Sequence, residues 1–86
     1  MHNQPEPVVG MAINWMEHIP GPGQKLRNKN LKEIKRTIGS GPFIITEVDK
    51  YTLRNQKIHY TVSIEREGIK IKYGSGRFGW CYFHPV

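Results

Sequence analysis

Basic side chains are the residues of this chain whose types and spacing most clearly indicate a chemistry. Six of the 13 Lys and Arg residues fall between positions 25 and 36, where Glu33 is the single acid. Clustered ammonium and guanidinium groups neutralise phosphates, so this segment is a candidate contact for nucleic acid. We expect phosphate contacts from this segment and from three later cations, which makes the full set Lys25, Arg27, Lys29, Lys32, Lys35, Arg36, Lys70, Lys72 and Arg77.

Aromatic rings would complement these charges, because unpaired bases stack on exposed rings. Four of the nine aromatic residues lie between positions 78 and 83. Phe78 lies between two glycine-rich turns, so we expect it to be the exposed ring of this group and to join the nucleic-acid site. Trp80 is assigned to the core. The competing interpretation is that all these rings form the core and that the cations only keep the chain in solution.

Neither a metal site nor a catalytic site is indicated. Cys81 and His84 have the spacing Cys-x-x-His, but a structural zinc site needs four ligands and a catalytic one needs three. The other histidines, at positions 2, 18 and 59, show no paired spacing. Aromatic neighbours indicate that Cys81 is buried, where a thiol has a raised pKa and is inert. We therefore expect no metal, no cofactor and no catalytic residue, and hence a protein that is not an enzyme.

Cysteine usage and hydropathy bear on the compartment. Cys81 is the only cysteine, so no disulfide can form within the chain, which fits a reducing compartment. No apolar run approaches the roughly 18 residues of a membrane span. Residues 1–7 lack the basic start and apolar stretch of a signal peptide. We expect a soluble cytoplasmic protein that does not bind membranes.

The segment with the basic cluster is predicted to contain a short helix over residues 31–38. Asn30 is a candidate N-cap with Glu33 three residues later, and Gly39 follows where a helix would end. An irregular or extended segment is the alternative, because Thr37 and the isoleucines have middling helix propensity. In the helix, the cations would project away from a shared apolar face at i, i+3 and i+7, formed by Leu31, Ile34 and Ile38.

The rest of the chain is predicted to form short strands. Apolar and polar residues alternate at 58–64 and 69–73, which is the period of strands with one buried face. Gly68 can adopt a left-handed conformation and so close a hairpin between them. The polar stretch 49–57 is expected to be a loop. We expect eight of the side chains in these strands to form the core, namely Ile58, Tyr60, Val62, Ile64, Ile69, Ile71, Tyr73 and Trp80.

These segments together indicate a single small domain. About five strands and one helical segment in 86 residues are typical of a mostly-β fold whose sheet is strongly bent or closed into a small barrel. We assign residues 8–86 to this domain. Residues 1–7 contain two prolines and almost no apolar side chain, so we expect a flexible tail.

The order of features resembles that of SH3-like small β-barrels. Three segments carry the resemblance, and these are Val8–Met11, Gly41–Ile45 and the terminal Trp80-x-x-Phe83-x-Pro85. The resemblance implies a barrel of about five strands, from a class whose members bind proteins, RNA or DNA. The chain lacks the acidic loop and the Ala-Leu-Tyr-Asp-Tyr run of SH3 domains that bind proline-rich peptides, so no site residue is transferred. An OB-fold is the second candidate fold.

Two functions are compatible with this sequence, and both are non-enzymatic. We expect binding of RNA or DNA through the basic residues named above. The alternative is a protein-interaction module of the SH3-like type, which would dock a protein partner on an edge strand or on the loops at 19–23 and 51–53. One continuous positive face would favour the first function, and a mixed surface the second.

Overall fold

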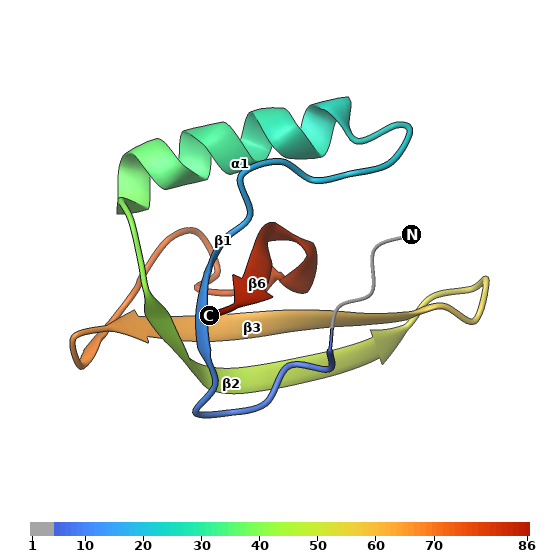
Figure 1. The fold of residues 1–86 in the computed structure, drawn as a ribbon. Coiled ribbons are helices and arrows are strands. Elements are labelled where there is room, and N and C mark those ends of the chain that lie inside the picture. Colours follow the sequence, from blue (N-terminus) through green and yellow to red (C-terminus); the bar gives the residue numbers. More distant parts are fainter. Residues whose placement is uncertain (1–4) are drawn as a thin grey trace.

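Residues 5–86 are described by the computed structural model, in which one α-helix lies along one side of an antiparallel sheet (Figure 1). A short 3-10 helix, η1 (Trp80–Tyr82), and the last strand (Phe83–Pro85) lie between this α-helix and the long hairpin of the sheet. In chain order, the structure contains β1 (Ala12–Trp15), α1 (Lys25–Ile38), β2 (Phe43–Thr52), β3 (Ile58–Arg66), β4 (Ile69–Lys70), β5 (Phe78–Gly79), η1 (Trp80–Tyr82) and β6 (Phe83–Pro85).

The sheet contains six antiparallel strands in the order β4-β3-β2-β1-β6, and β5 pairs with β3. This arrangement confirms the mostly-β class with one helical segment, but the predicted closure into a barrel is wrong. The helix η1 interrupts the chain between β5, which pairs with β3, and β6, which pairs with β1. Among residues 5–86, no strand pairing therefore joins the two ends of the sheet, and the sheet stays open.

The hairpin of β2 and β3 is longer than predicted. Its two strands pair as far as Thr52 and Ile58, so only residues 53–57 of the predicted 49–57 loop lie outside them. Backbone hydrogen bonds within 53–57 close the turn. Polar residues continue the hairpin here because each strand satisfies the backbone groups of the other.

The helix α1 begins at Lys25 rather than at Leu31. Asn30, the expected N-cap, lies within the helix, and the start is held by Asn28 instead. The side-chain amide of Asn28 accepts a hydrogen bond from the N–H of Ile19 at 2.7 Å and donates to the carbonyl oxygen of Ile19 at 3.0 Å. Ile19 is buried, so these bonds anchor the Pro/Gly loop to the helix. The first turns of α1 thus depend on a contact that no local capping pattern reveals.

Trp15 connects the helix to the sheet through the core. Its ring stacks on Phe83 with centroids 4.7 Å apart and meets Phe43 edge-to-face at 5.2 Å. Its Nε1 donates to the carbonyl oxygen of Gly39 at 2.8 Å, directly after α1. The buried apolar residues of the core are Ile13, Trp15, Ile19, Leu31, Phe43, Ile45, Val62, Ile64, Phe78, Trp80 and Phe83.

Three of the expected core residues are exposed instead, and these are Ile58, Ile69 and Tyr73. Ile58 lies at the far end of the hairpin, beyond the residues of β3 that pair with β5. Ile69 is 70 % exposed because β4 is a two-residue strand at the edge of the sheet, and Tyr73 follows it outside any strand. The alternation of apolar and polar residues therefore identified these strands. It did not show how much of each strand is covered by neighbouring parts of the fold.

The predicted tail, residues 1–7, is described only from residue 5 onwards, and residues 1–4 lie outside the described part. Pro7 is buried. The carbonyl oxygen of Pro5 accepts a hydrogen bond from Nε1 of Trp80 at 3.0 Å, and the Tyr60 hydroxyl donates to Oε1 of Glu6 at 2.9 Å. Residues 5–7 therefore contact the domain at β3 and η1.

Candidate nucleic-acid interface

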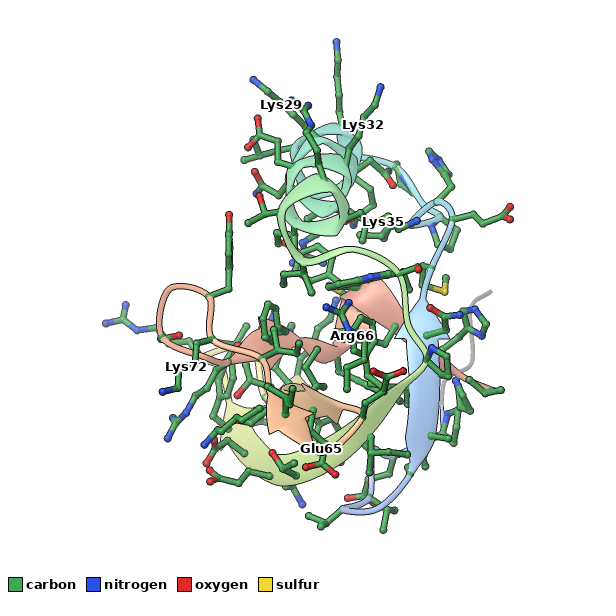
Figure 2. All side chains as sticks on the ribbon, turned by 90° about the vertical axis from the view of Figure 1, so that its left-hand side faces the viewer. Lys29, Lys32, Lys35, Glu65, Arg66 and Lys72 are labelled. Carbon is green, nitrogen blue, oxygen red and sulfur yellow. The ribbon has the colours of Figure 1, made fainter. Side chains whose placement is uncertain are left out.

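The predicted basic cluster lies on α1, whose solvent side carries most of it. Lys29 and Lys32 point away from the sheet (Figure 2). On the other side, Leu31 is buried and Ile34 packs against the core. The helical period turns the cations outward because the apolar residues face the sheet. Five of the six cations are exposed and Lys35 is half-buried, the exposed ones being Lys25, Arg27, Lys29, Lys32 and Arg36.

Within residues 5–86, no α1 cation forms an ion pair, although Glu33 belongs to the same helix. Each α1 cation therefore keeps its charge available to a ligand. The cations lie within a helix of 14 residues, about 21 Å long at 1.5 Å per residue. Four of them, Lys25, Lys29, Lys32 and Arg36, are spaced so that they share one face of the helix, whereas Arg27 and Lys35 lie off that face.

The later cations of the predicted set lie on a second, mixed surface. Nζ of Lys70 lies 3.8 Å from Oε1 of Glu47, and Nε of Arg77 lies 3.2 Å from Oδ2 of Asp49. Such exposed pairs contribute at most about 1 kcal/mol to stability. They nevertheless offset the positive charge of the sheet locally. Lys72 lies at the level of the sheet, apart from the helix cations (Figure 2). The structure thus does not bring the nine predicted cations together.

Phe78, the predicted stacking ring, is only 3 % exposed, so the expectation that it is exposed is wrong. Its ring meets Trp15 and Phe83 edge-to-face, at 6.3 Å and 6.2 Å, and stacks on Tyr73 at 6.2 Å. These neighbours cover it because β5 pairs with β3 at Val62, on the buried side of the sheet. Phe78 belongs to the core and leaves no face free for a base.

A cleft of about 450 Å³ lies between the first turns of α1, the far end of the hairpin and η1. Arg27 lines it from the helix, because it precedes Leu31 by four residues and so shares the sheet-facing side. Tyr51 and His59 line it from the hairpin, and their rings stack with centroids 5.7 Å apart. Tyr82 lines it from η1. We call this hollow the Arg27 cleft.

Three groups that line the Arg27 cleft, Tyr60, Cys81 and Tyr82, have raised pKa values, which favour their neutral forms. Burial raises the pKa of the Cys81 thiol, an effect that the positive charge of Arg27 partly offsets. Burial likewise raises the pKa of Tyr82, against a hydrogen bond with Asn30 and the charge of Arg27. The pKa of Tyr60 is raised chiefly by its hydrogen bond to Glu6. At neutral pH the Cys81 thiol and the two tyrosine hydroxyls are uncharged, so they do not offset the positive charge of Arg27.

Several residues of this region were absent from the predicted site. Tyr51 and Tyr60 line the cleft, and three exposed cations surround the hairpin turn, namely Lys50, Arg54 and Lys57. Tyr51 and the three cations were missed because 49–57 was expected to be a loop rather than the end of a hairpin, and Tyr60 was missed because it was assigned to the core. The signal was present in the spacing: pairing the strands across 53–57 sets Tyr51 opposite His59.

The described residues contain no group of three or more metal-ligating side chains, and no helix among them is long and apolar enough to cross a bilayer. Comparison with family models, characterised proteins and solved structures finds no significant match to this chain. Any function must therefore be argued from the surface of the molecule itself.

Proposed function

We propose that this protein is a non-enzymatic domain that binds RNA or DNA, with the phosphate backbone lying along α1. The observation that carries the proposal is that the exposed α1 cations form no ion pair within residues 5–86, whereas Lys70 and Arg77 are paired. Unpaired cations release counterions from a nucleic acid when they neutralise its phosphates, which is the main source of non-specific affinity.

The spacing of the α1 cations suits a phosphate backbone. Lys25, Lys29, Lys32 and Arg36 recur at i, i+4, i+7 and i+11, so they form one stripe along the helix. The stripe is about 16 Å long at 1.5 Å per residue. Because one strand of a duplex carries a phosphate about every 3.4 Å along its axis, the stripe can follow several phosphates.

The strand content and the single free cysteine are compatible with the same proposal. The small antiparallel sheet with one helix keeps the strand content, though not the closure, of the SH3-like barrels that the sequence resembles, and that class includes RNA-binding and DNA-binding members. A free, half-buried Cys81 fits a cytoplasmic location, where thiols stay reduced. We therefore propose a cytoplasmic SH3-like domain whose ligand is a nucleic acid.

A salt titration of binding tests this function. We expect a fluorescein-labelled 20-nucleotide single strand to bind at low salt, with an affinity that falls steeply as salt increases. The double variant Lys29→Gln/Lys32→Gln should reduce the slope of log affinity against log salt by about 1.4, at about 0.7 per lost contact. The control Lys70→Gln/Arg77→Gln removes the same net charge from the mixed surface and should change the slope by less. Absence of binding at low salt, or equal effects of the two variants, would overturn the proposal.

A protein partner is the second candidate function, and an apolar row on the outer face of the sheet favours it. Ile44 lies opposite Ala12 in the β1–β2 register, and the N–H of Val86 donates to the carbonyl oxygen of Ala12. All three residues are exposed. A partner recovered from nuclease-treated extract by the wild type, and lost with Ile44→Asp, would support this function; loss of every partner on nuclease treatment would reject it.

A further inference from the structure

The Arg27 cleft has the size and the lining of a site for a planar ligand. Its volume of about 450 Å³ lies within the roughly 300–1,000 Å³ of sites for small molecules. Its lining includes Arg27 and four residues with aromatic side chains, Tyr51, His59, Tyr60 and Tyr82. This composition fits a ligand that is aromatic and carries negative charge.

Tyr51 offers the most accessible ring of the cleft. Its side chain remains 46 % exposed although one face stacks on His59 at an interplanar angle of 20°. The strand register sets Tyr51 opposite His59, so both rings project on the same side of the hairpin. A base that enters the cleft can extend this stack on Tyr51.

Cations lie on both sides of the Arg27 cleft. The first turn of α1 and the turn of the β2–β3 hairpin lie at the same end of the molecule (Figure 1). Lys25 and Arg27 belong to the first turn of α1, and Arg54 and Lys57 belong to the hairpin turn. All four side chains are exposed. A strand that passes from the helix to the hairpin therefore meets positive charge before and after the cleft.

We propose that the Arg27 cleft receives one unstacked base of a single-stranded nucleic acid, with the base on Tyr51 and an adjacent phosphate on Arg27. This inference rests on the nucleic-acid binding proposed above and adds that the bound nucleic acid is single-stranded. Bases in a duplex are stacked on each other and do not enter such a cleft, so single strands bind more tightly than duplexes. The hydroxyl of Tyr60, which lines the cleft, donates a hydrogen bond to Glu6.

The test compares a labelled 12-nucleotide single strand with the 12-base-pair duplex of the same sequence, at constant salt. Tyr51→Ala should weaken binding of the single strand about tenfold, within the range measured for loss of one stacked base, and leave duplex binding unchanged. Tyr51→Phe should retain the wild-type affinity because the ring is kept. The control Tyr73→Ala removes another exposed ring outside the cleft, and it should have no comparable effect.

The outcomes distinguish the assignment of the cleft from the proposed binding along α1. Because Tyr51→Ala removes no phosphate contact, the salt slope should stay at the wild-type value. Equal affinity for single strand and duplex, or an equal loss in both with Tyr51→Ala, would overturn the assignment of the cleft but leave binding along α1 intact. If neither ligand binds at low salt, both proposals are rejected. Far-ultraviolet circular dichroism of each variant verifies that the fold is retained.

Discussion

The guanidinium of Arg66, at the end of β3, donates from Nη1 to the carbonyl oxygen of Ile38, the last residue of α1, at 2.8 Å. The same nitrogen donates to the carbonyl oxygen of Ser40 at 3.0 Å, and the guanidinium lies 5.9 Å from the ring centroid of Phe43. Figure 2 shows Arg66 between the helix and the sheet. Arg66 thus connects the end of α1 to the sheet.

Replacing Arg66 should therefore destabilise the whole domain. Arg66→Met keeps a long side chain but leaves the carbonyl oxygens of Ile38 and Ser40 without this donor, which should lower the free energy of unfolding by about 1–3 kcal/mol. Urea unfolding followed by circular dichroism measures the change. Arg54→Met, in the exposed hairpin turn, removes the same charge and should change stability by less than about 0.5 kcal/mol. Similar losses in both variants would contradict a structural role for Arg66.

Gly41 has no room for a side chain. A Cβ at this position would lie 2.7 Å from Oδ1 of Asn14 and 2.9 Å from Cδ2 of Phe43, which is fully buried. We expect Gly41→Ala to lower the free energy of unfolding by about 1–3 kcal/mol, because the packed ring cannot move aside without cost. At Gly79 the nearest atom to such a Cβ is Sγ of Cys81 at 3.5 Å, an ordinary contact. Gly79→Ala should accordingly have little effect, and thermal unfolding of the two variants compares them directly.

The thiol of Cys81 should be less reactive than an ordinary cysteine at neutral pH. Burial raises its pKa, so the thiolate fraction at a given pH is smaller than in the unfolded chain. The rate of alkylation by iodoacetamide should rise toward its plateau only at a higher pH in the native protein than in concentrated urea. A native rate that reaches its plateau at a lower pH than the unfolded rate would contradict this expectation.

The raised pKa of Cys81 also makes the stability of the domain vary with pH in the alkaline range. Because the folded pKa of Cys81 lies above the unfolded value, its contribution to stability is present below the unfolded pKa and declines as the pH rises toward the folded pKa. Cys81→Ala should weaken this decline. Some pH dependence should persist in the variant, because the pKa values of Tyr60 and Tyr82 are also raised.

Local patterns predicted the strands and the helix but not their limits. The alternation at 58–64 and the helical period of Leu31, Ile34 and Ile38 are properties of neighbouring residues, and both elements are present. The start of α1 was missed because it depends on hydrogen bonds between Asn28 and Ile19, nine residues apart. Phe78 was wrongly expected to be exposed because its ring is buried by Trp15 and Phe83, and no local pattern connects these residues to it.

The sequence by itself determined the mostly-β class, the single helix and the concentration of positive charge at residues 25–36, because these follow from composition and from periods of a few residues. Only the tertiary structure decided which charges remain free. Lys70 meets Glu47, and Arg77 meets Asp49, across more than twenty residues of chain. The tertiary structure also brought Arg27 to the cleft that Tyr51 and His59 of the hairpin line. Charge neutralisation and cavities depend on distances in space, and only the folding of distant segments against each other determines these.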